Sequence, residues 1–171
     1  MTRIGLLSDT HCFIHPRLFT FFEKVDEIWH AGDFGDMATA DKLAEFKPLR
    51  GVYGNIDGQS VRMIYPLHLR FMCEETDVWI THIGGYPGKY EQYVMPDIFM
   101  KPPALFISGH SHILKVIYDK KLNFLHVNPG AAGCKGPHKV CTAIRFIIDG
   151  KDIRELEIWE MERTKIVPEI F

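Results

Sequence analysis

The sequence has 171 residues, of which 46% are hydrophobic and 25% charged, and its net charge is −2 with the histidines neutral. These values are typical of one soluble globular domain, and they exclude a globally basic surface, so nucleic acid is expected at most as a substrate. No apolar run approaches the length of a membrane span and no signal-peptide pattern precedes Arg3. We therefore expect a cytoplasmic protein with no membrane partner.

The first third of the chain alternates short apolar runs with amphipathic stretches. Strands are predicted at residues 3–7, 28–29 and 49–53, and helices at 16–24 and 37–46. Pro16 suits the first turn of a helix, and Asp36 is a candidate helix N-cap. Strands that alternate with helices predict a parallel sheet with crossover helices.

The remainder of the chain is rich in strands. Hairpins are predicted for 67–73 with 78–81, for 115–118 with 122–127, and for 140–148 with 153–159. A further strand is predicted at 105–108, a helix at 91–100, a loop at 84–88 and a turn at 128–130. We expect an α/β fold in which two sheets pack as a β-sandwich flanked by helices, with one domain over residues 1–160 and a charged tail over 161–171.

The most informative stretch is Gly109-His110-Ser111-His112, which follows the predicted strand at 105–108. In an extended backbone residues i and i+2 point to the same face, so His110 and His112 are expected to aim at one place. Imidazole is the commonest metal-binding side chain, and two at one strand end indicate a shared metal site. A lone histidine is more often structural, so this pair alone is not decisive.

Similar groups follow four other predicted strands, in the segments Asp9-Thr10-His11, Gly32-Asp33, Gly54-Asn55 and His82. Ligands bind beyond the carboxyl ends of strands in open α/β sheets, so these groups are expected to converge. A glycine before three of the ligands is expected to give the backbone a sharp exit from the strand. The structural alternatives are caps or turns for the two aspartates and a left-handed turn for the asparagine.

The donor types indicate which ions suit such a cluster. Its two carboxylates contribute a charge of −2, whereas two divalent cations contribute +4, so the loaded cluster would attract an anion such as phosphate or hydroxide. Mixed nitrogen and oxygen donors fit manganese, iron, nickel, cobalt or zinc better than magnesium alone. Water bound to such an ion has a pKa lowered towards ~7 in favourable zinc sites.

The five segments resemble the signature of the calcineurin-like metallophosphoesterases, and the compact form with Asn128-Pro129-Gly130 is similar to their small bacterial and archaeal phosphodiesterase subgroup. The resemblance extends from residue 4 to about residue 149. It implies a four-layer α/β/β/α fold and a phosphodiesterase. Such an enzyme would hydrolyse a small phosphate ester by in-line attack of a metal-bound hydroxide.

The resemblance also implies a ligand set for two divalent ions, with manganese preferred and nickel, iron, cobalt or zinc compatible. One ion would be held by Asp9, His11 and His112, and the other by Asn55, His82 and His110, with Asp33 bridging the two. Catalytic roles would fall to Asp33, Asn55 and His82, and substrate contacts to Asn55, His82 and Gly130.

One position departs from the family pattern. Many members have a histidine after the Gly-Asn asparagine, but this chain has Ile56, which donates no proton. We therefore expect the best hydrolysis with activated diesters, with water, His30 or His138 as alternative proton sources. The segment 130–133, with Lys135 and Lys139, is either a phosphate-binding element or a flexible loop.

A second reading of the same fold is a protein-interaction scaffold, because the resemblance extends to a retromer subunit whose metal site is degraded. All seven ligand positions here keep competent donors, which favours the enzyme. A homodimer or higher homo-oligomer is compatible with the aromatic-rich loop at 83–95, which has no interpretable substrate-reading pattern.

Overall fold

The computed structural model of the protein describes residues 1–163, and its first sheet has the strand order β12-β11-β1-β2-β3. These strands are β1 (Thr2–Leu7), β2 (Glu27–His30), β3 (Leu49–Gly51), β11 (Val140–Asp149) and β12 (Asp152–Glu162). β1, β2 and β3 are parallel. The helices α1 (Pro16–Phe21) and α2 (Met37–Phe46) connect them, which confirms the predicted crossovers.

The second sheet has the order β4-β5-β8-β10-β9. Its strands are β4 (His68–Cys73), β5 (Thr76–Thr81), β8 (Leu105–Ile107), β9 (Leu114–Asp119) and β10 (Phe124–Pro129). The central three are parallel to one another, and the two edge strands are antiparallel to their neighbours. The three predicted hairpins are present as β4-β5, β9-β10 and β11-β12.

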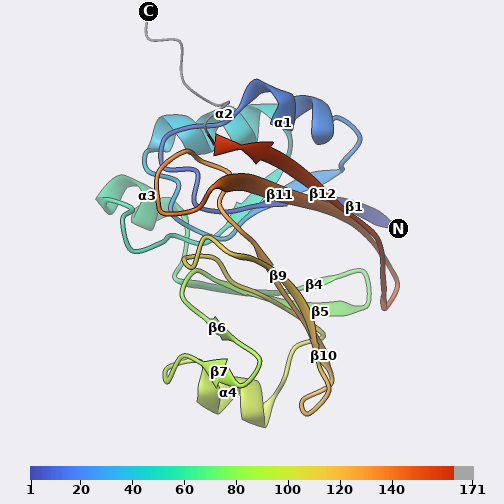
Figure 1. The fold of residues 1–171 in the computed structure, drawn as a ribbon. Coiled ribbons are helices and arrows are strands. Elements are labelled where there is room, and N and C mark those ends of the chain that lie inside the picture. The colour runs from blue at the N-terminus through green and yellow to red at the C-terminus, as the bar shows by residue number, and fades with distance from the viewer. Residues whose placement is uncertain (164–171) are drawn as a thin grey trace, which may run out of the picture.

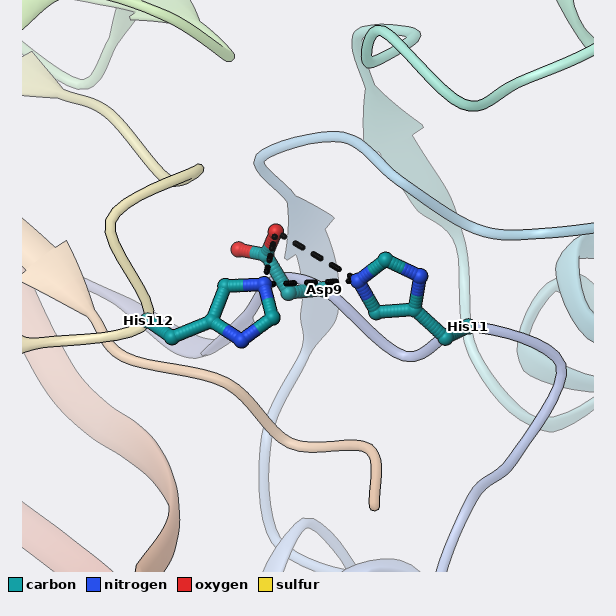
Figure 2. A group of neighbouring side chains, drawn as sticks. All are labelled: Asp9, His11 and His112. Carbon is teal, nitrogen blue, oxygen red and sulfur yellow. Dashed lines mark hydrogen bonds and ion pairs between the residues drawn. The ribbon is translucent and has the colours of Figure 1, made fainter. Parts of the chain in front are cut away.

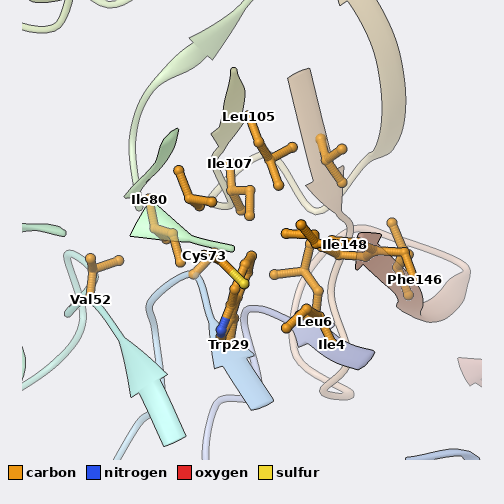
Figure 3. Close-up of a cluster of buried hydrophobic side chains, with 14 residues drawn as sticks. Ile4, Leu6, Trp29, Val52, Cys73, Ile80, Leu105, Ile107, Phe146 and Ile148 are labelled. Atoms are coloured by element: carbon orange, nitrogen blue, oxygen red, sulfur yellow. The ribbon is translucent and has the colours of Figure 1, made fainter. Parts of the chain in front are cut away.

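Figure 1 shows the two sheets face to face, with α1 and α2 above the first sheet. Below the second sheet lie β6 (Gly85–Tyr86), β7 (Lys89–Tyr90) and α4 (Met95–Met100). Side chains from both sheets fill the space between them, including Trp29, Ile80 and Ile107 (Figure 3). Two further apolar clusters lie on the outer faces of the sheets. The predicted two-sheet sandwich flanked by helices is therefore confirmed.

Several elements differ from the predictions. The helix α3 (Gln59–Ile64) was not predicted, because it is short and Gly58 at its N-cap makes no side-chain capping hydrogen bond. The helix predicted at 91–100 begins only at Met95, where Pro96 occupies the first turn. The loop predicted at 84–88 contributes to the β6–β7 hairpin, and most of the turn predicted at 128–130 belongs to β10.

Two other predicted boundaries also differ from the structure. The helix predicted at 16–24 ends at Phe21, after which the chain turns into β2. β12 continues to Glu162, two residues past the predicted domain boundary, and residues 164–171 of the predicted tail lie outside the described residues. Within residues 1–163 no helix is long and apolar enough to cross a membrane.

Candidate metal centre

The seven predicted ligands lie in loops that follow strands of both sheets. Asp9 and His11 follow β1, Asp33 follows β2 and Asn55 follows β3, whereas His82 follows β5 and His110 and His112 follow β8. Parallel strands bring the loops at their carboxyl ends to one edge of a sheet. The packing of the two sheets then places most of these side chains beside one another at that edge of the sandwich.

The backbone at this edge is left-handed, and the extended conformation expected for the Asp-x-His and His-x-His pairs was wrong. Asp9, His11, Asp33, His110 and His112 have φ values between 47° and 65°. This conformation costs non-glycine residues roughly 1 kcal/mol or more, so surrounding contacts must hold it. The Asp9 amide donates to the Gly32 carbonyl at 2.9 Å, and the His11 amide donates to the Asp33 carbonyl at 3.1 Å.

Glycine precedes three of the ligands for two different reasons. Gly32, before Asp33, has a φ of 98°, which favours glycine. Gly54 and Gly109 are instead required by close approach. A Cβ atom would lie 2.0 Å from Asp33 Oδ1 at Gly54 and 2.2 Å from Ser8 Oγ at Gly109.

Asp9, His11 and His112 face one another and form the first group (Figure 2). Asp9 Oδ1 lies 3.1 Å from His112 Nε2 and 3.9 Å from His11 Nε2, and the two Nε2 atoms are 3.3 Å apart. Donor atoms that bind one ion at ~2.0–2.2 Å lie roughly 3–4 Å from one another. The group therefore has the spacing that a single cation needs.

A second group consists of Asp9, Asp33 and His82, with Asn55 beside it. Asp33 Oδ2 lies 3.3 Å from His82 Nε2 and 3.8 Å from His11 Nε2, and Asn55 Oδ1 lies 3.1 Å from His82 Nε2. Asp33 thus faces histidines of both groups, as a bridging ligand would. Asp9 also belongs to both groups, which the resemblance did not imply.

Hydrogen bonds on the far sides of two rings determine which nitrogen faces the cluster. His82 Nδ1 donates to the Ala31 carbonyl at 2.7 Å, so in the neutral ring the Nε2 lone pair is directed at the carboxylates. His138 Nε2 donates to the Gly133 carbonyl at 2.9 Å, so His138 Nδ1 accepts from His112 Nδ1 at 3.0 Å. The Nε2 lone pair of His112 therefore also points inward. Such outer hydrogen bonds commonly orient metal-ligating histidines.

The cluster consequently places hydrogen-bond acceptors against one another. Asp9 Oδ1 is buried and has no hydrogen-bond partner. Among the described residues neither Asp9 nor Asp33 forms an ion pair with lysine or arginine. Buried charges without a partner are costly, and a divalent cation between these donors would satisfy them. The mixed nitrogen and oxygen donors fit a transition-metal ion.

The same contacts shift the pKa values of the ligands when no metal is bound. Burial acts to raise the pKa of Asp9, but its contacts with His112 and His82 outweigh burial and hold the pKa below its usual value. Burial is likewise outweighed at Asp33, where His82 lowers the pKa. For His82 burial lowers the pKa, but Asp33 and Asp9 together raise it above its usual value. Both carboxylates are ionised at neutral pH, as metal ligands must be.

His110 lies at the border of the cluster. Its ring centroid is 5.3 Å from that of His82, and its side chain is exposed. Its backbone amide donates to Asp9 Oδ2 at 3.1 Å, so the residue supports Asp9 through its main chain. Metal binding by the His110 imidazole remains a prediction.

Two residues that follow Asn55 in the sequence, Asp57 and Arg62, support the site without having been predicted to do so. Asp57 is buried, and its carboxylate accepts the backbone amides of Gly35 and Gly54, each at 2.8 Å. Arg62 of α3 donates to the carbonyls of Asn55 and Asp57. These contacts join the loops after β2 and β3. In the sequence, the only indication of these contacts was the acidic residue Asp57 shortly after Asn55.

Asn128 fixes the loop that carries His110 and His112. Its side-chain Nδ2 donates to the Gly109 carbonyl at 2.8 Å and to Ser111 Oγ at 3.1 Å. The Asn128 side-chain oxygen accepts the Gly130 amide at 2.9 Å, and Gly130 is buried. Contact of Gly130 with substrate stays a prediction. The Gly130 amide already donates to Asn128, so it is not a free donor for a phosphate oxygen.

The two histidines considered as proton sources are both engaged elsewhere. His30 is fully buried and stacked on Phe34, and burial lowers its pKa to about 3. Both nitrogens of His138 are used by His112 and Gly133. These contacts leave water as the remaining proton source of the three.

The protein is thus a two-sheet α/β sandwich with a carboxylate–imidazole cluster at one edge. The family model for the calcineurin-like phosphoesterase superfamily domain matches residues 2–151. The chain belongs to this superfamily.

Individual relatives agree with this assignment. A probable metallophosphoesterase of Methanothermobacter thermautotrophicus is 30% identical over 136 residues, which cover 75% of this chain and 76% of that protein. Vps29 of Chaetomium thermophilum has the same fold, with a TM-score of 0.75 and 16% identity over 94% of both chains. A novel archaeal phosphodiesterase has a TM-score of 0.66 and 21% identity, over 92% of this chain and 99% of that one.

Proposed function

We propose that the protein is a phosphodiesterase that depends on two divalent metal ions and hydrolyses a small phosphate ester. One observation carries this proposal. The Nε2 atoms of His82 and His112 face two buried carboxylates, those of Asp33 and Asp9. When bound, paired ions supply charge neutralisation at the phosphoryl oxygens and a water nucleophile of lowered pKa. Manganese is our preferred ion, and nickel, iron, cobalt or zinc also suit the donors.

The roles of the residues follow from their positions. Asp9, His11 and His112 would hold one ion, and Asn55 and His82 the other. Asp33 faces both groups, and its second oxygen accepts the Ile56 amide at 3.0 Å, which fixes the carboxylate between them. Asn55 and His82 would also orient the phosphate ester.

The position after Asn55 bears on the choice of ester. The Ile56 side chain is 46% exposed beside the cluster and has no proton to give to a leaving group. Esters of acidic alcohols need little protonation as they leave. We therefore expect activated diesters, such as aryl phosphodiesters, to be the best substrates among simple esters.

The test is hydrolysis of bis(4-nitrophenyl) phosphate by protein stripped with a chelator and reloaded with manganese or nickel. Asp33→Asn should lower turnover at least about a hundredfold, because a neutral amide bridges two cations poorly. Asp41→Asn, the same change at an exposed residue of α2, should leave turnover unaltered. Full turnover in Asp33→Asn would refute the proposal.

A protein-interaction scaffold is the second candidate, favoured by the likeness in fold to Vps29. The complete donor set weighs against it, since a scaffold has no need of a buried carboxylate oxygen, Asp9 Oδ1, that lacks a hydrogen-bond partner. Failure to hydrolyse any phosphate ester, together with no metal binding at ample supply, would favour the scaffold.

A further inference from the structure

A cavity of about 210 Å³ lies next to the metal centre on the outer face of the second sheet. Its walls come from the β6–β7 hairpin, from β9 and β10, and from the loop of Gly109, His110 and Ser111, which also borders the metal centre. Benzene occupies an apolar cavity of about 150 Å³, so this volume admits a phosphate group or a small ring. The cavity therefore has the position and the size of a substrate subsite.

His126 of β10 lines the cavity, and its ring packs against Phe106 with the ring centroids 5.7 Å apart. Its side chain is 0% exposed, and neither ring nitrogen makes a hydrogen bond. Burial and the positive charge of Lys115 lower the pKa of His126 to about 4, so the ring is neutral and keeps one N–H donor. A buried polar group without a partner costs roughly 1–3 kcal/mol, which a ligand in the cavity would recover.

The charged groups around the cavity favour an anion. Lys115 is adjacent because it pairs with Asn128, two residues from His126 on the same face of β10. Its Nζ lies 3.6 Å from the centroid of the Tyr86 ring. Lys89 contributes a second positive charge and Glu91 one negative charge, so the lining is net positive. Among the described residues neither lysine has an ion-pair partner.

We propose that this cavity binds a second phosphate group, carried on one ester arm of the substrate, through the His126 N–H and the Lys115 ammonium group. The inference rests on the proposed function, because the ester phosphorus itself would lie at the metal centre. His110 forms the common wall of the two sites. The substrate class is therefore a phosphodiester with a phosphorylated alcohol arm.

Binding is tested first without metal, so that the result does not depend on catalysis. Inorganic phosphate is titrated into the full chain in chelator, and the imidazole signals of His126 are followed by NMR. These signals should shift in a saturable way. Lys115→Met should weaken phosphate binding about tenfold, the loss expected for one charge-assisted hydrogen bond. Lys120→Met, an exposed lysine at the β9–β10 turn, is the matched control and should bind phosphate as the wild type does.

The substrate arm is tested with two 4-nitrophenyl diesters whose second arm is 3-hydroxypropyl or its 3-phosphate. The wild-type KM should be about tenfold lower for the phosphorylated ester, and Lys115→Met should bring the ratio of the two KM values close to one. No shift of the His126 signals, or equal KM values in the wild type, would overturn the inference. Hydrolysis of neither ester would defeat the proposed function instead, while the phosphate titration would still decide whether the cavity binds phosphate.

Discussion

His112 presents its Nε2 atom to the candidate metal centre because its Nδ1 atom is hydrogen-bonded to His138. The hydrogen bond of His138 to the Gly133 carbonyl makes the other nitrogen of His138 an acceptor, and this fixes the proton of His112 on Nδ1. A residue outside the proposed ligand set thereby controls the orientation of a candidate ligand.

Replacing His138 should therefore weaken metal binding. His138→Phe keeps a ring but removes both nitrogens, and the manganese affinity measured by titration calorimetry should fall 10- to 100-fold. His68→Phe is the control, since His68 contacts Thr81 on β5 and does not support a ligand. Equal affinity in His138→Phe and wild type would contradict the support assigned to His138.

Two other buried histidines limit stability in acid. The pKa values of His30 and His126 are lowered by burial to about 3 and about 4. Between these values and the unfolded pKa of about 6.5, the unfolded chain binds protons that the folded protein does not. Their contribution to stability is thus fully present above about pH 6.5 and is lost as the pH falls. Each histidine accounts for up to about 1.4 kcal/mol per pH unit.

Urea unfolding from pH 7 to pH 5 tests this dependence. The wild type should lose stability steadily over this range, and His126→Phe should lose it less steeply because one of the two groups is gone. An identical pH slope in the two proteins would show that His126 binds protons equally in the folded and unfolded states, which would contradict its lowered pKa.

At the scale of elements, Asp57 joins the loop after β2 to the loop after β3. Its carboxylate accepts backbone amides from both loops. Asp57→Asn removes the negative charge and places a side-chain NH₂ donor against the backbone N–H donors that the carboxylate accepts. The free energy of unfolding in urea should therefore fall by about 2–3 kcal/mol. Asp41→Asn should change it by less than about 0.5 kcal/mol, and an equal effect of the two substitutions would rule out this bridging role.

Periodic sequence patterns predicted the strands of the two five-stranded sheets and their three hairpins, because each is a local signal repeated over several residues. The helix α3 escaped prediction since it is short and lacks a side-chain cap. The candidate ligands were proposed from strand ends and residue type, and most of them lie together in the structure. Their left-handed backbone was not, because it depends on hydrogen bonds between loops distant in sequence. Asn128 and His138 support the site through contacts of the same long-range kind.

At the scale of the whole molecule, the candidate centre lies where the two sheets meet. Asp9, Asp33 and Asn55 come from the first sheet, and His82 and His112 come from the second. Ions held by both sets would join the two sheets at this edge. Metal binding is therefore expected to stabilise the entire fold and not only the loops.

This linkage predicts a rise in Tm with metal. Manganese at 100 times its Kd adds about 2.7 kcal/mol to the stability of the folded state. For a chain of this size, that increment corresponds to roughly 5–11 °C in Tm by differential scanning calorimetry. Asp33→Asn should show little of this rise, and a metal-dependent rise as large as that of the wild type would place the ions elsewhere.

The central claim is that side chains from five loops can hold two cations between the sheets. An anomalous difference map from a crystal soaked in manganese tests it most directly. We predict two peaks about 3.5–4 Å apart, one beside Asp9, His11 and His112 and one beside Asn55 and His82, with Asp33 between them. A map with no peak in this cluster, or with its manganese peaks bound elsewhere on the protein, would contradict the account.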